Sequence, residues 1–275
     1  MVATMTTSVR DSGPRPPGAI GPRALLVDRA ALDPIAGGEA RPNRRREFAP
    51  NARLVSRVDL TPSVARFVIR PDAGVPRFRP GQYFAIGLQV DSTLLQRPYS
   101  TASPPGVVEE VEFLVRRVEV GSFTPHLWRV PPGGRLWLGP PKGLFTLRPG
   151  DSRGHLFVST GTGLAPFISM SEAILRSRDA VAGARDAAIG DEPGPRIVVV
   201  HGVSHASELA YRDRLEAWSA AGRLAYVPTV SRSSDPANAG WTGNTGRAEA
   251  ILGRVCNTLD IDPDDTSPTC AATRR

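Results

Sequence analysis

The chain has 275 residues, a formal net charge of +7 and a sequence pI near 10.3. Apolar residues make up 40% of it and charged residues 22%, which is ordinary for a globular protein and excludes a collagen, a coiled coil and a fully disordered chain. There is no run of roughly 18 apolar residues to span a membrane and no secretion signal, so we expect a cytoplasmic protein without a membrane partner.

Residues 1–47 are predicted to form a mobile tail. Gly, Pro, Arg and small residues are scattered through them with no sustained apolar period, and Arg44-Arg45-Arg46 stand near their end. Such a segment does not bury enough apolar surface to offset the entropy lost on ordering. We therefore expect the fold to begin near Phe48.

Residues 48–150 have the pattern of an antiparallel β-barrel. Short apolar runs alternate with turn clusters such as Arg79-Pro80-Gly81 and Pro104-Pro105-Gly106. Short strands at this spacing, separated by Gly and Pro, are typical of a barrel or a sandwich. The predicted strands are 54–58, 65–69, 82–88, 111–115 and 135–138, and a short helix ends at Leu127-Trp128.

Residues 151–266 change to an alternation of strand, turn and helix. The predicted strands are 155–159, 196–200 and 224–230, and the predicted helices are 165–177, 207–220 and 245–259. This alternation is typical of a doubly wound parallel sheet with helices on both faces. The sequence thus predicts two domains, a barrel followed by an α/β domain.

The first candidate site is Arg97-Pro98-Tyr99-Ser100. An arginine can clamp a phosphate with its planar guanidinium. A tyrosine two residues later faces the same side of a strand, where its ring can stack on a flat ligand, and Ser100 can donate a hydrogen bond to that ligand. The alternative is an edge strand with a surface arginine.

The second candidate site is Gly161-Thr162-Gly163, which follows a predicted strand and precedes Pro166. Glycines let a phosphate approach the backbone, proline suits a first helical turn, and a helix N-terminus favours an anion. The spacing is not the G-x-G-x-x-G fingerprint, and an ordinary strand-to-helix turn is the alternative.

The third candidate site is Ser231-Arg232, just after the third strand of the α/β domain, with Arg247 further on. Ligands bind at the carboxyl ends of strands in such sheets, and these side chains could hold a phosphate there. A solvated loop is the alternative. We expect the four histidines to be structural rather than catalytic, although His201 could line a nucleotide cleft. No metal site is predicted.

Taken together, these residues resemble the ferredoxin–NADP reductase superfamily of two-domain flavoproteins, over roughly residues 50–266. Residues 97–100 match the R-x-Y-S flavin motif of that family, and residues 161–167 match its G-T-G-x-A-P-F nucleotide motif. Residues 201–213 are similar to the family's segment after the second α/β strand.

The resemblance implies FAD on the barrel and NADPH on the α/β domain. Arg97 would hold the FAD pyrophosphate together with Thr124 of the Gly121-Ser122-Phe123-Thr124 stretch. Tyr99 would stack on the isoalloxazine and Ser100 would lie near its reactive nitrogen, which makes these two the catalytic candidates. Ser231 and Arg232 match the pair that selects NADPH over NADH.

The implied function is an FAD-dependent oxidoreductase that passes electrons between NADPH and a one-electron protein acceptor such as ferredoxin or flavodoxin. These acceptors are acidic, so a basic face would steer them. Arg116, Arg117 and Arg129 are candidates for it. The two cysteines exclude a disulfide framework and a four-cysteine iron–sulfur cluster. Alternatives are the reductase component of an oxygenase system, a non-catalytic truncated flavin-binding remnant and a basic nucleic-acid binder.

The C-terminus departs from the family pattern. In the family, the helix that corresponds to residues 245–259 is followed by a strand similar to Ala-Tyr-x-Cys-Gly-Asn-Pro. In this chain residues 267–275 are instead Ser-Pro-Thr-Cys-Ala-Ala-Thr-Arg-Arg. These residues can be encoded by a DNA sequence that also encodes Ala-Tyr-Leu-Cys-Gly-Asn-Pro when its reading frame is shifted one base earlier. We therefore expect a one-base frameshift after about Thr266. The α/β domain would then lack a strand and a helix, and the reaction with NADPH would be weakened.

The distribution of charge argues against a nucleic-acid partner. Of the 34 basic residues only Lys142 is a lysine, a bias expected of a GC-rich genome. Residues 1–47 hold eight arginines against five acids, and residues 267–275 hold two arginines and no acid. Only +2 of the total +7 is therefore left for residues 48–266.

Overall fold

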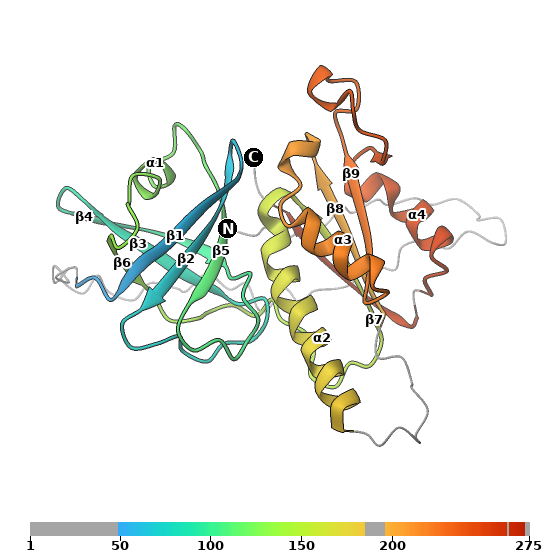
Figure 1. The fold of residues 1–275 in the computed structure, drawn as a ribbon, viewed down its shortest axis with the longest axis horizontal. Coiled ribbons are helices and arrows are strands. Elements are labelled where there is room, and N and C mark those ends of the chain that lie inside the picture. Colours follow the sequence, from blue (N-terminus) through green and yellow to red (C-terminus); the bar gives the residue numbers. More distant parts are fainter. Residues whose placement is uncertain (1–48, 185–195, 263, 273–275) are drawn as a thin grey trace, which may run out of the picture. The chain divides into compact units, whose positions relative to one another are not determined.

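The computed structural model describes residues 49–184, 196–262 and 264–272 (Figure 1). The predicted tail, residues 1–47, lies outside the described residues, and so do residues 273–275 at the C-terminus.

Residues 49–147 contain a six-stranded antiparallel sheet in the order β4-β3-β6-β1-β2-β5. Its two end strands meet, because Thr101 at the end of β4 forms a bridge with Phe113 of β5. Ala102 N also donates to Glu112 O at 2.8 Å. This closure confirms the predicted barrel. The elements are β1 (Ala52–Thr61), β2 (Val64–Pro71), β3 (Tyr83–Val90), β4 (Thr93–Ser100), β5 (Val111–Arg116), α1 (Thr124–Leu127) and β6 (Arg135–Leu138).

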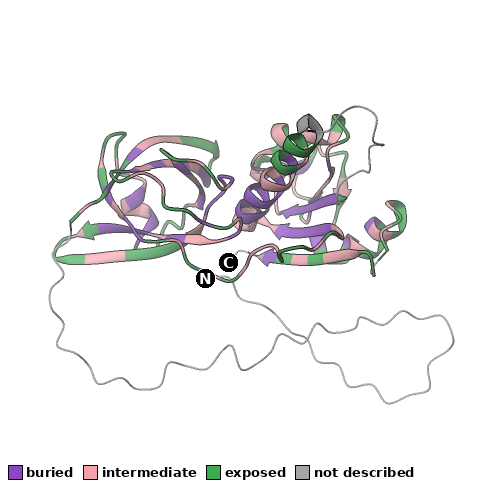
Figure 2. Cartoon of the chain, turned by 90° about the horizontal axis from the view of Figure 1, so that it is seen from below, coloured by how far each residue is buried: buried purple, intermediate pink, exposed green. Residues whose placement is uncertain are grey.

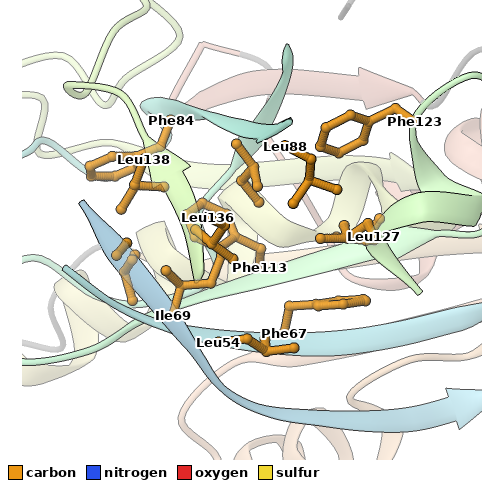
Figure 3. Close-up of a cluster of buried hydrophobic side chains, with 14 of the residues drawn as sticks. Leu54, Phe67, Ile69, Phe84, Leu88, Phe113, Phe123, Leu127, Leu136 and Leu138 are labelled. Atoms are coloured by element: carbon orange, nitrogen blue, oxygen red, sulfur yellow. The ribbon is translucent and has the colours of Figure 1, made fainter. Parts of the chain in front are cut away.

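Alternation along the strands builds the core of the barrel. In β2, Ala65, Phe67 and Ile69 are fully buried while the residues between them are partly exposed, which is the period of two that a barrel requires. Their side chains meet those of the facing strands, including Phe84 and Phe113 (Figure 3). The rings of Phe84 and Phe113 pack edge to face with centroids 5.9 Å apart.

The α/β domain contains a five-stranded sheet in the order β10-β9-β8-β7-β11, with every pair parallel. All seven residues of β8 are buried, as expected of a central parallel strand (Figure 2). The elements are β7 (Gly154–Thr160), η2 (Gly161–Leu164), α2 (Ala165–Ala184), β8 (Ile197–Val203), η3 (Ala206–Glu208), α3 (Arg212–Ala220), β9 (Ala225–Val230), η4 (Pro236–Asn238), β10 (Asn244–Thr245), α4 (Ala248–Thr258) and β11 (Thr266–Ala272).

The two faces of this sheet are covered by different helices. Phe157 and Val199 point into one cluster with residues of α2 and α3, whereas Val158 and Val200 point into another with residues of α4. The sheet is therefore doubly wound, as predicted.

Residues 267–272 correct one expectation. We expected the α/β domain to lack a strand there, but Thr266–Ala272 form β11, which pairs with β7 from Thr266 opposite Gly154 to Ala272 opposite Thr160. The edge of β7 offers backbone groups that need partners, and the side chain of Ala271 is small enough to be buried against the α2 core. The strand expected to be missing is thus present in the sheet.

The helix predicted over 207–220 is interrupted. Tyr211 has φ 58°, a left-handed conformation that stops η3 from continuing into α3. Its hydroxyl donates to a carboxylate oxygen of Glu112 in β5, and desolvation raises the pKa of this hydroxyl. The helical spacing of apolar residues over 207–220 could not predict this interruption, because the contact of Tyr211 is with a strand that is distant in sequence.

None of the described helices is long and apolar enough to cross a membrane.

Gly81 gives a test of the turn before β3. Its φ is +92°, and a Cβ there would overlap the carbonyl oxygen of Phe145. Gly133 has a similar φ of +82° but nothing within 4 Å of its Cβ position. We expect Gly133→Ala to cost about 1–2 kcal/mol of stability for the backbone conformation alone, and Gly81→Ala to cost at least about 1–3 kcal/mol more because of the overlap. Equal losses in urea unfolding would contradict this reading of the turn.

Candidate functional site

The barrel brings the first motif against the loop that follows β5. Arg97 and Tyr99 lie on the same side of β4, and Arg97 Nη2 donates to Ser122 Oγ at 2.9 Å. Arg97 Nη1 donates to Gln96 O at 2.7 Å. The guanidinium is thus fixed beside the loop while Arg97 stays exposed, which suits the binding of an anion.

Tyr99 has an apolar neighbour that orients its ring. The ring is half-buried, and its centroid lies 6.0 Å from the centroid of the Phe123 ring. Burial raises the pKa of the Tyr99 hydroxyl. Pro98 pairs with Ala85 and half-buried Ser100 with Tyr83 across β3 and β4. A flat aromatic ligand would therefore meet an oriented ring, with the Ser100 position next to it.

Thr124 has a different role in the loop from that of Ser122. Its hydroxyl donates to Val118 O at 3.0 Å and accepts from Val118 N at 2.9 Å, and its side chain is buried. The hydroxyl therefore closes the loop, and Ser122 is the residue that meets Arg97. Thr124 was expected to bind the pyrophosphate, and the hydrogen bond from Arg97 adds Ser122 as a second candidate of the same loop.

The glycine turn stands where the sequence placed it, between β7 and α2. Gly161 has φ 52°, and the residues from Gly161 to Leu164 form the short helix η2. Pro166 is the second residue of α2, where its missing N–H costs nothing.

His201 of β8 holds this turn. Its side chain is fully buried, with Nε2 3.2 Å from Gly161 O and Nδ1 3.3 Å from the hydroxyl of Tyr226. Burial lowers the pKa of His201 from 6.5 to about 4, so the ring is neutral and carries one N–H. Because the Gly161 oxygen can only accept, Nε2 donates and Nδ1 accepts from Tyr226.

The third motif occupies the carboxyl end of β9. Ser231 Oγ donates to Val203 O at 3.1 Å, which fixes the serine against the end of β8. Arg232 is exposed and forms no ion pair with any residue that the structure describes. Arg247 is the residue immediately before α4, and its side chain makes no capping hydrogen bond. It is largely exposed, with Nη1 3.9 Å from Glu249 Oε1. Gly246 N donates to Val230 O at 2.9 Å, so this arginine is tied to the same edge of the sheet.

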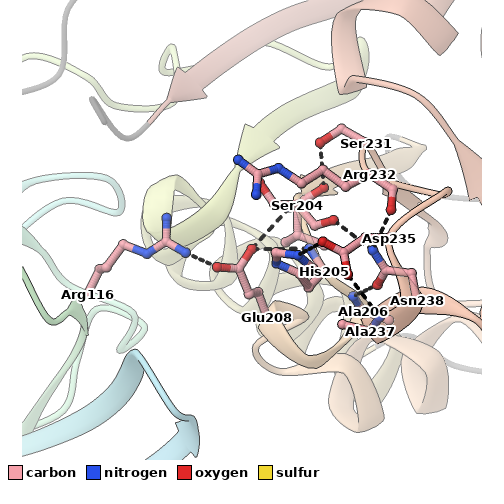
Figure 4. A network of polar contacts seen from close by, with 11 residues as sticks. Arg116, Ser204, His205, Ala206, Glu208, Ser231, Arg232, Asp235, Ala237 and Asn238 are labelled. Atoms are coloured by element: carbon pink, nitrogen blue, oxygen red, sulfur yellow. Dashed lines mark hydrogen bonds and ion pairs between the residues drawn. The ribbon is translucent and has the colours of Figure 1, made fainter.

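Glu208 belongs to the stretch 201–213 that resembles the family, but the sequence predicted no role for it. One oxygen accepts from Ser204 N and His205 N, at 3.1 and 3.3 Å. The other pairs with Arg116 of β5 (Figure 4). Arg116 was expected on a basic face for an acceptor, but this ion pair neutralises it. Arg117 and Arg129 are exposed.

Two family models match the chain in the predicted order. The oxidoreductase FAD-binding domain matches residues 51–147, and the oxidoreductase NAD-binding domain matches residues 157–266. Ferredoxin–NADP reductase B of Sorangium cellulosum is 32% identical over 219 residues, which are 79% of this chain and 82% of that protein. The chain belongs to the ferredoxin–NADP reductase superfamily.

Further relatives agree with this membership. The ferredoxin–NADP reductase of Azotobacter vinelandii is 36% identical over 71% of this chain and 74% of its own length. The reductase component of phenol 2-monooxygenase from a Pseudomonas strain is 29% identical over 69% of this chain and 49% of its own length. A ferredoxin–NADP reductase of Neisseria gonorrhoeae, solved with FAD and NADP, shares the fold at 22% identity, with a TM-score of 0.62, over 80% of this chain and 83% of that one.

As a member of this superfamily, the protein is a flavoprotein oxidoreductase with an FAD-binding barrel and a nicotinamide-nucleotide-binding α/β domain. The residues present fit these groups. Arg97 and Ser122 offer donors for a phosphate beside the half-buried ring of Tyr99, and the glycine turn stands at the N-terminal start of the long helix α2.

The neutral His201 predicts a pH dependence of stability. Its folded pKa lies below the unfolded value, so the unfolded chain gains a proton that the folded chain does not take up as pH falls from about 6.5 to about 4. Stability should therefore drop across this window, by on the order of 3 kcal/mol for this group alone. His201→Gln keeps a donor for Gly161 but cannot titrate, so its urea-unfolding free energy should fall less between pH 7 and 5. Parallel curves for the two proteins would contradict the assignment.

Proposed function

We propose that this flavoprotein passes electrons between NADPH and a one-electron protein acceptor such as ferredoxin or flavodoxin. FAD, when bound, accepts two electrons together from NADPH and can release them one at a time. The observation that carries the proposal is the placement of the three motifs. Arg97 lies within β4 of the barrel, whereas the glycine turn follows β7 and Ser231-Arg232 follow β9 in the α/β domain.

The barrel residues bind and orient the flavin in this proposal. Arg97, held by Ser122, binds the pyrophosphate, and Tyr99 stacks on the isoalloxazine with Ser100 beside its reactive nitrogen. Thr124 supports the same pyrophosphate by closing the loop that carries Ser122.

The α/β residues bind the nucleotide in this proposal. The turn Gly161-Thr162-Gly163, followed by Pro166, receives the pyrophosphate at the start of α2. Ser231 and Arg232 bind the 2′-phosphate, with Arg247 as a further cation at the same edge. An exposed arginine without an ion pair can make a charge-assisted contact to a phosphate without first breaking another one.

A second candidate is the reductase component of an oxygenase, which differs only in the acceptor. It is supported by relatives such as the phenol 2-monooxygenase reductase component and the toluate 1,2-dioxygenase electron transfer component of Pseudomonas putida, which is 36% identical over 148 residues. The cytoplasmic location expected from the sequence stays a prediction.

Flavin content and turnover test the proposal directly. The purified full chain should be yellow, carry about one FAD per chain and reduce cytochrome c with NADPH faster when a ferredoxin is added. Stimulation by an oxygenase component instead of ferredoxin would favour the second candidate. Bound FAD without turnover would favour the non-catalytic remnant, and a colourless protein that binds no FAD would refute the flavin site.

Arg232→Ala tests the nucleotide preference. A charge-assisted hydrogen bond contributes about 1.5–3 kcal/mol, so the KM for NADPH should rise about tenfold or more. The KM for NADH should change little, because NADH has no 2′-phosphate. Arg254→Ala removes an exposed arginine from α4 of the same domain and should leave both values unchanged. Equal losses for NADPH and NADH in Arg232→Ala would refute the assignment.

A further inference from the structure

Two loops meet at the carboxyl edge of the α/β sheet, one after β8 and one after β9. The first contains Ser204, His205 and Ala206, and the second contains Ser231, Arg232 and Asp235 (Figure 4). Both originate from neighbouring parallel strands, with Val203 opposite Val230. The relative position of the two loops therefore determines the position of the Arg232 Cα atom.

Asn238 joins these loops from below the surface. Its side chain is 3% exposed, and its amide makes three hydrogen bonds, all to the backbone. Nδ2 donates to Arg232 O at 2.7 Å and to Ser204 O at 3.1 Å, while Oδ1 accepts from Ala206 N at 2.8 Å. Every hydrogen of the amide is used, so its orientation is determined. The amide therefore fixes the main chain of Arg232 itself.

A second link runs between the same loops. One oxygen of Asp235 lies 3.1 Å from His205 Nε2, and the other accepts from Ala237 N at 2.9 Å. The positive charge of Arg232 helps to lower the pKa of Asp235, after hydrogen bonds from Ala237 and His205. The two carboxylate oxygens are thus engaged by partners other than the guanidinium, which leaves Arg232 available for a phosphate.

We propose that Asn238 is a positioning residue, assisted by the Asp235–His205 pair, that holds Arg232 for the 2′-phosphate and thereby sets the preference for NADPH over NADH. The inference rests on the proposed function, because it assumes that Arg232 meets the nucleotide. Asn238 does not touch the nucleotide in this account. By holding the Arg232 loop in one conformation before NADPH binds, Asn238 lowers the entropy that the loop loses on binding. This raises the affinity for NADPH without a new contact to it.

The role predicts a selective effect. Loss of the amide frees the main chain of Arg232, so NADPH should lose the affinity that this arginine provides. NADH uses the glycine turn but not Arg232, so it should bind as before. A purely structural role would instead lower the yield or the stability and affect both nucleotides alike.

The test compares steady-state kinetics of the FAD-loaded full chain with NADPH and with NADH. Asn238→Ala should raise the KM for NADPH about tenfold, with kcat within twofold and the KM for NADH unchanged. Asn51→Ala is the control in the barrel, since the amide of Asn51, an exposed residue, also bonds backbone groups, namely Leu138 N and O. Its NADPH-to-NADH ratio of KM values should equal that of the wild type.

A double-mutant cycle shows whether Asn238 acts through Arg232. If it does, Asn238→Ala should add little to the KM for NADPH once Arg232→Ala is present. Additive effects, or equal losses for both nucleotides, would overturn the inference. If Asn238→Ala does not yield folded, FAD-loaded protein, His205→Ala tests the second link, which leaves the buried amide intact. It should raise the KM for NADPH alone, and an unchanged value would overturn the inference.

The outcomes separate this inference from the proposed function. Selective loss of NADPH in Arg232→Ala, without such a loss in Asn238→Ala, would refute only the positioning role. A wild-type protein that uses NADPH and NADH equally well would refute the 2′-phosphate assignment, and one that uses neither would refute the nucleotide site. Either result would also refute the positioning role.

Discussion

The parallel register of β7, β8 and β9 is the constraint on which the nucleotide site depends. Ser159 lies opposite His201, which lies opposite Pro228, so the three strands end at one edge of the sheet. The loops that follow them therefore converge, although their residues are far apart in the sequence. A strand-to-helix turn, a serine–arginine pair and a buried asparagine lie along the same edge because hydrogen bonding between the strands sets it.

Buried polar side chains hold these loops in place. His201 links the glycine turn to β9, and Asn238 links the loops after β8 and β9. Both side chains are buried, where an unmade hydrogen bond costs more than a made one contributes. The loops that these side chains hold therefore have few alternative conformations, so the main chain of the exposed arginines in them has a defined position. The barrel follows the same principle, since buried Thr124 closes the loop that brings Ser122 to Arg97.

The many arginines of this chain divide by their partners. Arg116 and Arg223 are paired with carboxylates, and such pairs are stabilising or neutral rather than available for a ligand. Arg97 is held by a hydroxyl and a carbonyl, and Arg232 is not ion-paired within the part of the chain described. An arginine without a carboxylate keeps its full charge for an anion, and this is the property that the proposed cofactor roles of Arg97 and Arg232 require.

The two-domain order, the doubly wound alternation and the three motifs can be predicted from the amino-acid sequence, because periods of two and 3.6 residues and the special backbone of Gly and Pro are local properties. The fold was needed to show the partner of Arg116, the left-handed Tyr211, the place of β11 at the sheet edge and the hydrogen bonds of Ser122, His201 and Asn238. Each of these depends on a contact between segments remote in sequence, and strand order and register, which bring those segments together, leave no mark on the local pattern of residues.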